Sequence, residues 1–419
     1  MTDPADLTAT EALAEMGAGR LDAAAWLEAC LARIAVREPV VRAMAFLDEG
    51  LVRETAAVEG PLRGMPLGVK DVLDTADMPT GYNSPIWAGH RPRADAAPVA
   101  WARKAGAVVV GKTVTTEFAT RVPGPTTNPW NAGHTPGGSS SGSAAGVAAG
   151  FFPVAYGTQT AGSVIRQAAY CGVVGYKPTF GTVNRHGMKL MSESLDTIGV
   201  MARSVADCAL VVGAVSDLEL GDPAVRVAAP RVGMCWTGMR ARAGAETEAL
   251  MERVAGQLAR AGAAVVGRVL PGEYDGLEEA HTIVMNGESG RAMGWELATH
   301  RDALSETLLE RLEWGLAQGG AALAAARGVM RRLQDGFEDV MDGVDVLVTP
   351  AAPGEAPAGL AWTGDASFNL VWTALHVPCV TVPAGVGPNG LPLGIQVVGR
   401  RGADRDVLAW AQWVAVAVN

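Results

Sequence analysis

A serine and an arginine stand close together in a segment of small residues, GTQTAGSVIRQ at positions 157–167. Ser163 follows Ala161 and Gly162, and Arg166 comes three positions after the serine. Small residues allow consecutive backbone N–H groups to converge on one point, which is what a developing oxyanion needs. Ser163 is therefore a candidate nucleophile, but no histidine lies near it in the sequence to take its proton.

A lysine can replace histidine as the base that activates a serine, provided that its amine is neutral. The pKa of an ordinary lysine is about 10.4, so burial or neighbouring positive charge must lower it. Lys70 lies in the short apolar segment PLGVKDVLD, at positions 66–74, which predicts a buried strand. The alternative interpretation is a strand-end lysine whose amine extends into solvent.

The lysine segment, a Ser/Gly-rich loop and the serine segment occur in this order, and together they resemble the amidase signature family. The motifs that carry the resemblance are PGGSSSGSAAGVAAG, GTQTAGSVIR, YCGVVGYKPTFG and SLDTIGVMARSVADCAL, at positions 136–150, 157–166, 170–181 and 194–210. A weaker match extends through 376–399, so the resemblance covers nearly the whole chain. It implies an α/β/α fold with a large mixed central β-sheet flanked by helices.

The resemblance also implies a Ser–Ser–Lys triad that cleaves amides through an acyl-enzyme. By position, Ser163 is the nucleophile, Ser139 the bridging serine and Lys70 the base. In the family the peptide bond before the bridging serine is cis, and here that bond joins Gly138 to Ser139. We expect neutral Lys70 to take the proton of Ser139, which in turn takes the proton of Ser163.

The same motifs supply the other residues of the expected site. Backbone N–H groups of four consecutive residues are predicted to form the oxyanion hole: Thr160, Ala161, Gly162 and Ser163. The predicted substrate-binding residues are Arg166, Thr158 and Ser141. No His, Cys, Asp or Glu cluster has the spacing of a metal site, so we expect neither a metal nor a cofactor.

The position of Arg166 bears on the substrate. The family's usual arginine stands two residues after the nucleophile, where this chain has Ile165, and Gln159 and Ala161 replace its usual Asp and Gly. The shifted arginine resembles a malonamidase-type branch that hydrolyses small carboxylated amides, although Gln167 stands where that branch usually has proline. We expect the planar fork of Arg166 to hold a substrate carboxylate. The alternative is a salt bridge that braces the loop.

Three other motif matches are rejected. GAVVVGKT at 106–113 fits the phosphate-loop pattern, but AVVV is strand-forming and its N–H groups would be used in a sheet. GVGPNG at 385–390 predicts a hairpin turn rather than a dinucleotide-binding loop. GSSSG at 138–142 resembles a nucleophile elbow, but no strand precedes it and no histidine stands in a recognisable setting among His186, His281, His300 and His376.

Strands and helices alternate along the chain, which predicts an α/β protein. The expected strands are at 66–74, 105–113, 152–160, 231–236, 263–269, 345–350 and 391–399. Helices are expected at 21–36, 94–105, 246–262, over most of 300–342, at the C-terminus, and in the Ala-rich end of 136–152. Since no repeat or linker is visible, we predict one amidase domain over 1–419, with the signature core at about 60–215.

Composition limits the choice of partners and compartment. The 419 residues carry a net charge of −10, which argues against nucleic acid or an anionic membrane as a partner. The five cysteines are dispersed and lack CxxC spacing, and no export signal is visible, so we expect reduced thiols and a cytoplasmic location. The expected partners are a small-molecule amide and water, with a homodimer as a candidate assembly.

These observations favour a metal-free amidohydrolase that releases ammonia or an amine from a small amide or urea derivative, one that carries a carboxylate. The first alternative is the glutaminase subunit of a tRNA-dependent amidotransferase, which needs partner subunits and an ammonia channel. The second is a catalytically silent binding protein on the same fold. Lys70, Ser139 and Ser163 are all present, which argues against the second alternative.

Overall fold

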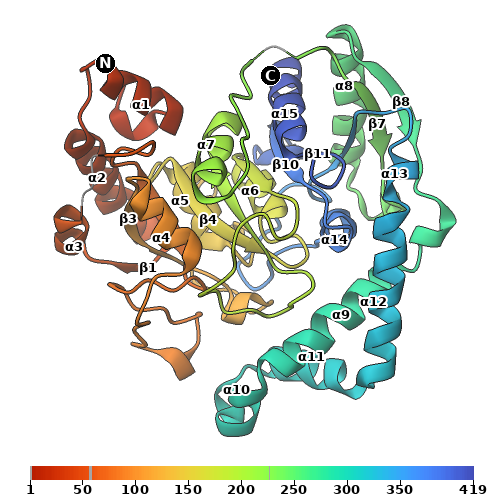
Figure 1. Ribbon diagram of the computed structural model, residues 1–419, viewed down its shortest axis with the longest axis horizontal. Helices are drawn as coiled ribbons and strands as arrows, with labels where there is room; N and C mark the ends of the chain where they lie inside the picture. The colour runs from red at the N-terminus through yellow and green to blue at the C-terminus, as the bar shows by residue number, and fades with distance from the viewer. Residues whose placement is uncertain (1, 56–58, 226) are drawn as a thin grey trace.

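The computed structural model describes residues 2–55, 59–225 and 227–419. Its strands are β1 Met44–Leu47, β2 Pro66–Lys70, β3 Val108–Thr113, β4 Val154–Gln159, β5 Val174–Lys177, β6 Thr197–Ala202, β7 Arg231–Cys235, β8 Ala264–Arg268, β9 Val346–Pro350, β10 Cys379–Val386 and β11 Pro392–Val398. In the described part of the chain they form one sheet in the order β1-β3-β2-β4-β6-β5-β10-β11-β9-β7-β8 (Figure 1). The sheet mixes parallel and antiparallel pairs and is flanked by helices, which confirms the expected fold class.

The helices lie between and beyond these strands. They are α1 Ala9–Gly17, α2 Ala23–Val41, α3 Glu49–Glu54, α4 Ala97–Lys104, α5 Ser141–Ala149, α6 Ile165–Cys171, α7 Val205–Val215, α8 Ala245–Arg260, α9 Leu277–Ala292, α10 Gly294–Thr299, α11 Glu306–Ala317, α12 Gly319–Asp335, α13 Phe337–Val340, α14 Ser367–Ala374 and α15 Asp404–Val418. None of the helices in the described ranges is both long and apolar enough to span a membrane.

Three neighbouring strands bring the predicted chemistry to one edge of the sheet. The strand β2 pairs in parallel with both β3 and β4, so all three have their carboxyl ends at the same edge. The residues of β2 and β4 are all buried, as their apolar sequences predict. Because β2 ends at Lys70 and β4 ends at Gln159, the lysine and the serine segment meet at this edge.

Small residues let the two helices of the signature motifs approach the sheet closely. A Cβ atom on Gly142, in α5, would lie only 2.2 Å from the carbonyl oxygen of Ala43. No side chain larger than hydrogen fits there without moving backbone, so glycine at position 142 is a packing requirement. The same helix packs against α6, β2 and β4, and this contact holds the two serine segments together.

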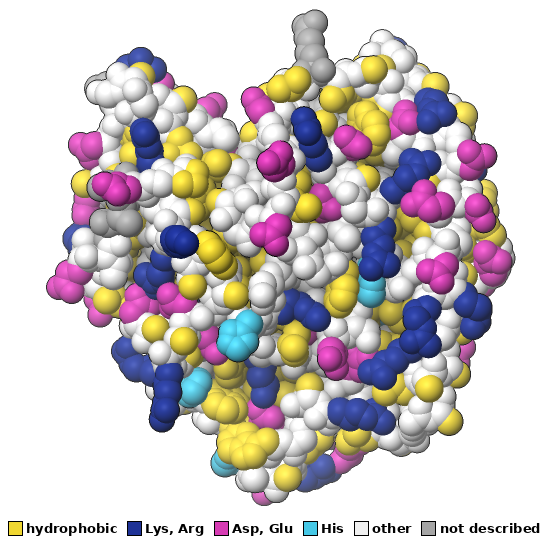
Figure 2. Space-filling view, viewed as in Figure 1, with side chains coloured by type: hydrophobic (Ala, Val, Ile, Leu, Met, Phe, Trp, Pro, Cys, Tyr) yellow, Lys and Arg dark blue, Asp and Glu magenta, His cyan; other side chains and the backbone are white. Residues whose placement is uncertain are grey.

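The second half of the chain completes the sheet and supplies a helical cover. The segment GVGPNG forms the turn between β10 and β11, which pair antiparallel as the hairpin interpretation predicted. Helices α11 and α12 both pack on α9, and together with α10 they project away from the sheet (Figure 1). Figure 2 shows acidic and basic side chains interspersed over this face of the molecule.

Candidate active site

Lys70 lies at the end of β2 with its side chain fully buried. Its Nζ atom donates hydrogen bonds to Ser139 Oγ and Thr158 Oγ1, both at 2.7 Å. Burial disfavours the charged amine and lowers the pKa of Lys70 to about 7, although the negative charge of Asp196 opposes the shift. The neutral amine that a base requires is therefore accessible near neutral pH, and the alternative of an amine extending into solvent is wrong.

Ser139 follows a cis peptide bond from Gly138, as the resemblance implies. Its hydroxyl is buried beside Lys70. The next residue, Ser140, connects this loop to the second serine segment: its Oγ atom donates to the carbonyl oxygen of Ser163 at 2.5 Å. The backbone N–H of Thr158 in turn donates to Ser140 Oγ at 3.2 Å. The serine of the rejected elbow motif thus holds backbone groups of the site.

Gln159 organises the turn that carries Ser163. Its Oε1 atom accepts hydrogen bonds from the backbone N–H groups of Val164 and Ile165, at 2.8 and 3.0 Å. Its Nε2 atom donates to Thr373 Oγ1, which itself donates to the carbonyl oxygen of Ala161 at 2.7 Å. The amide of Gln159 therefore supplies both an acceptor and a donor, whereas an ionised Asp at this position could only accept.

The predicted oxyanion-hole segment is held from both sides. The hydroxyl of Thr160 donates to Asp196 Oδ1 at 2.6 Å, and its carbonyl oxygen lies 2.8 Å from Nε2 of His281 in α9. A carbonyl can only accept, so Nε2 carries the proton, and burial lowers the pKa of His281 to about 4, which keeps the ring neutral. Within the described ranges, no group accepts a hydrogen bond from the N–H of Ala161, Gly162 or Ser163, so all three remain able to donate.

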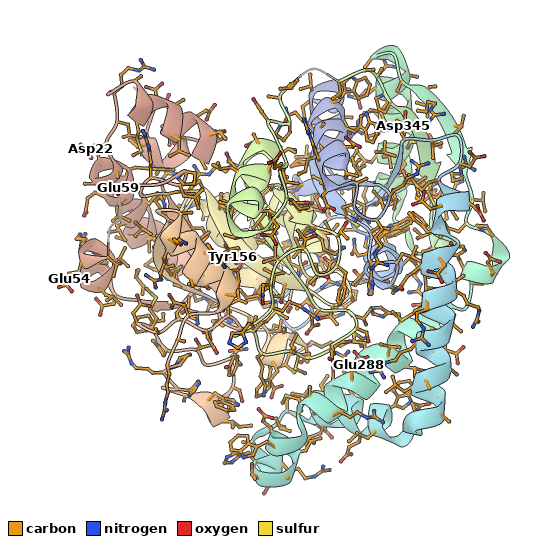
Figure 3. All side chains as sticks on the ribbon, in the orientation of Figure 1. Asp22, Glu54, Glu59, Tyr156, Glu288 and Asp345 are labelled. Carbon is orange, nitrogen blue, oxygen red and sulfur yellow. The ribbon has the colours of Figure 1, made fainter. Side chains whose placement is uncertain are left out.

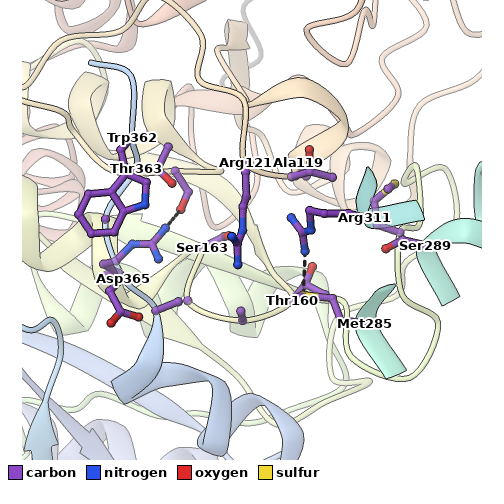
Figure 4. Close-up of a pocket in the computed structure, with 18 residues that line it drawn as sticks. Ala119, Arg121, Thr160, Ser163, Met285, Ser289, Arg311, Trp362, Thr363 and Asp365 are labelled. Atoms are coloured by element: carbon purple, nitrogen blue, oxygen red, sulfur yellow. Dashed lines mark hydrogen bonds between the residues drawn. The ribbon is translucent and has the colours of Figure 1, made fainter. Parts of the chain in front are cut away.

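A cavity of about 210 Å³ opens over Ser163 (Figure 4). Its floor includes Gly138 and the backbone of 160–163. The side chains that complete its walls come from several elements: Arg121, Arg166, Met191, Met285, Ser289, Arg311, Trp362, Thr363 and Asp365. The cavity is small for a ligand site, which favours a small substrate.

Arg166 lines this cavity from the first turn of α6 and is buried. Its Nη2 atom donates to the carbonyl oxygen of Gly138, whereas its buried Nε has no partner among the described residues. No carboxylate in the described ranges forms a salt bridge with Arg166, so the bracing contact that does occur is to backbone rather than to an acidic side chain.

The structure does not bring every predicted site residue to the cavity. Thr158 contacts Lys70 rather than the cavity wall, and the hydroxyl of Ser141 donates to the carbonyl oxygen of Val114 at 3.2 Å. The hydroxyls of Ser139 and Ser163 share no hydrogen bond in this described region, although such bonds commonly tighten only when substrate is bound.

Several residues at the site were not anticipated from the sequence. Arg121 and Arg311 line the cavity, and His281, Asp196 and Thr373 hold its floor. The segment SLDTIG did contain Asp196, but nothing in its spacing indicated a contact with Thr160. Over the described residues, no three His, Cys, Asp or Glu side chains are placed to hold a metal ion.

Comparison with known proteins places this arrangement in a family. Residues 25–408 match the family model described as Amidase. The chain belongs to the amidase family of hydrolases, which act on amide C–N bonds.

Individual relatives are similar over nearly the whole chain. The glutamyl-tRNA(Gln) amidotransferase A subunit of Chloroflexus aurantiacus is 35% identical, over 96% of this chain and 94% of the relative. The structure of the native peptide amidase from Stenotrophomonas maltophilia is 32% identical with a TM-score of 0.80, and the match covers 100% of this chain and 97% of that one. Another structure, described as an amidase, is 29% identical with a TM-score of 0.90, covering 99% and 100%.

Proposed function

We propose that this protein hydrolyses the C–N bond of a small, carboxylate-bearing amide or urea derivative through a Ser163–Ser139–Lys70 relay. The observation that carries the proposal is the 2.7 Å hydrogen bond between the fully buried Lys70 amine and Ser139 Oγ. A lysine in this setting is a base near neutral pH. Ser163 lines the cavity, and its carbonyl oxygen accepts a hydrogen bond from Ser140, the residue that follows Ser139.

In the first half of the proposed reaction, Ser163 Oγ forms a bond to the amide carbonyl carbon. Its proton passes to Ser139, whose own proton passes to Lys70. The backbone N–H groups of 160–163 stabilise the oxyanion. As the C–N bond breaks, the proton returns through Ser139 to the leaving nitrogen, which departs as ammonia or an amine.

In the second half, a water molecule replaces the amine. It attacks the ester carbon while its proton passes through Ser139 to Lys70. The bond between the acyl carbon and Ser163 then breaks, and the proton returns to the serine oxygen. The net reaction consumes one amide and one water, and it yields one carboxylic acid and one amine.

Arg166 supports the choice of a carboxylated, malonamidase-type substrate. It lies three residues from Ser163 and lines a small cavity, and its Nε atom has no partner among the described residues. Its planar guanidinium can hold a carboxylate in two directed hydrogen bonds, which Lys cannot do. A short anionic amide bound there would have its carbonyl within a few bonds of Ser163.

Two measurements test this function. A fluorophosphonate probe should label the wild-type protein and not Ser163→Ala, and ammonia release should be measured over a panel of short amides with and without a carboxylate. Arg166→Ala and Arg166→Lys should each lower kcat/KM for anionic amides by about ten- to a hundredfold, and for neutral amides much less. Equal losses on both classes would assign Arg166 to bracing the Gly138 loop. Failure to label would favour a silent binding protein.

The glutaminase subunit of a tRNA-dependent amidotransferase is the second candidate function. The similarity to amidotransferase A subunits supports it, with identities of 34–35% to three Chloroflexus proteins. Such a subunit would take glutamine as its amide and would act with partner subunits. Copurification of such subunits, together with glutamine as the preferred amide, would establish this function instead.

A further inference from the structure

Three arginines meet in the cavity over Ser163, although the protein as a whole is acidic. Arg166 enters from α6, Arg311 from α11, and the exposed Arg121 from the loop that follows a short 3-10 helix, Glu117–Ala119. Figure 4 shows the side chains of Arg121 and Arg311 both pointing into the cavity, close to Thr160 and Ser163. The proposed function uses Arg166 alone, so two guanidinium groups still need an explanation.

Arg121 and Arg311 lack acidic partners within the described residues. Neither forms a salt bridge with an Asp or Glu there. The Nη2 atom of Arg311 donates to Asn286 Oδ1 at 2.9 Å and lies 3.7 Å from the sulfur of Met285, both of which are uncharged partners. A charged group that is partly removed from water without a counter-ion costs free energy, so the partly buried Arg311 would gain from an anion bound beside it.

The positive charges also act on one another. Burial lowers the pKa of Arg311 to about 10, and the neighbouring charge of Arg121 contributes to the shift. Burial likewise lowers the pKa of Arg166, with a further contribution from Arg121. Arg121 therefore lies close enough to interact with both of the other arginines. An anion bound between them would relieve this repulsion.

We propose that Arg121 and Arg311 form a second anion-binding subsite, and that the substrate is a short amide or urea derivative with two carboxylates, one held by this pair and one by Arg166. The inference rests on the proposed amidohydrolase function and narrows its substrate class. The charge of the cavity supports it: three guanidinium groups and the carboxylate of Asp365 leave two positive charges, which a dianion neutralises.

The alternative occupant is a zwitterion, and the position of Asp365 argues against it. A zwitterion such as glutamine would need a carboxylate for its ammonium group, and Asp365 is the acidic side chain on the described cavity wall. That carboxylate already lies 4.0 Å from Arg242 and interacts with Arg166. It accepts a hydrogen bond from the backbone N–H of Ser367 as well. The charge of Asp365 is thus shared among protein groups, whereas Arg121 and Arg311 form no salt bridge among the described residues.

A binding experiment tests the subsite without relying on turnover. Glutarate and butyrate have similar lengths but carry two and one carboxylates, and calorimetry on the Ser163→Ala protein measures their affinities. In that background, Arg121→Gln and Arg311→Lys should each weaken the binding of glutarate by about tenfold or more and the binding of butyrate by a smaller factor. The preference for the dianion over the monoanion should therefore fall. The exposed Arg260 in α8 provides a matched control, since Arg260→Gln removes one positive charge that does not line the cavity.

Turnover separates this inference from the proposed function. On the wild-type protein, kcat/KM for ammonia release from N-carbamoyl-aspartate should exceed that from N-carbamoyl-alanine, and both arginine variants should reduce this ratio by about tenfold or more. If no amide is cleaved while glutarate binding still depends on Arg121 and Arg311, the proposed function fails and the subsite stands. Equal affinity for glutarate and butyrate, equal losses on both, or tighter binding of glutamine than of glutarate would overturn the subsite.

Discussion

The pH dependence of the reaction gives the sharpest test of Lys70 as the base. The relay needs the neutral amine, so activity should rise with pH as Lys70 loses its proton. Burial lowers the pKa of Lys70 from 10.5 to about 7, because the charged form loses its hydration in the fully buried position. The profile of kcat/KM should therefore rise with pH, pass through a midpoint near pH 7 and then level off. That midpoint is an apparent pKa of Lys70 together with the serine hydroxyls that are coupled to it.

The size of this effect follows from the fraction of neutral amine. With a pKa of about 7, that fraction is roughly a tenth at about pH 6 and roughly nine tenths at about pH 8, so the rate rises about tenfold over this interval and then levels off. An unperturbed lysine would give a rise of about a hundredfold over the same interval, and the rise would continue well into the alkaline range.

The assay is kcat/KM on a neutral amide, which avoids any contribution from carboxylate binding. Lys70→Arg serves as the matched variant, because a guanidinium remains protonated at every accessible pH. The kcat/KM of this variant should therefore show no rise with pH. Lys70→Ala should lose several orders of magnitude. If Lys70→Ala kept more than about a tenth of the wild-type kcat/KM, a loss below ~1.4 kcal/mol, or if the wild-type rate rose without a plateau, Lys70 would not be the base.

Four further results are expected. Ser163→Ala should have no measurable turnover because it lacks the acylated atom, whereas Ser139→Ala should keep a trace; equal residual activity would contradict the relay. Asp196→Asn removes a negative charge that favours protonated Lys70, so the midpoint of the pH profile should move lower, and a higher midpoint would contradict this assignment. His281→Leu frees the Thr160 carbonyl and should lower kcat by about tenfold or more with a smaller change in KM, while an effect on KM alone would speak against a role in the oxyanion hole. EDTA should leave activity unchanged, and loss that zinc restored would refute the metal-free mechanism.

The sequence was most informative about the sheet edge that carries the proposed relay. Apolar segments bounded by Gly and Pro predicted β2, β3 and β4 at nearly their observed bounds, although the strand expected at 66–74 ends at Lys70. The strands β1, β5, β6 and β10 were not among the expected strands, although the hairpin turn expected at 385–390 lies at the end of β10. The strands β1 and β5 have only four residues each, whereas β6 and β10 lie in segments that were identified as motifs rather than as strands. Short strands depend on their neighbours in the sheet more than on their own sequence.

The cavity walls were least predictable because their side chains come from distant segments. Arg311 stands in α11 and was expected only as part of a mostly helical region, 300–342. Its approach to Arg121 depends on how α11 packs against α9, and on contacts such as that of Glu288 in α9 (Figure 3) with Ser192 at 2.6 Å and with Arg327. A periodic pattern can predict that a helix forms, but it does not predict which exposed residue will face a cavity formed with another segment.

This division between sheet edge and helical cover explains why similarity to known proteins determines the reaction class but not the substrate. The chain is 35% identical to one component of an amidotransferase and 32% identical to a peptide amidase, proteins whose names indicate very different amides. The groups proposed to break the C–N bond lie on β2, on the loop before α5 and on the loop before α6. The groups proposed to select the acid portion of the substrate lie at the start of α6, in α11 and in the loop at Arg121. Because the two sets occupy largely different segments, the selecting groups can change while the relay stays the same, and the substrate must be inferred from the charges in this chain's own cavity.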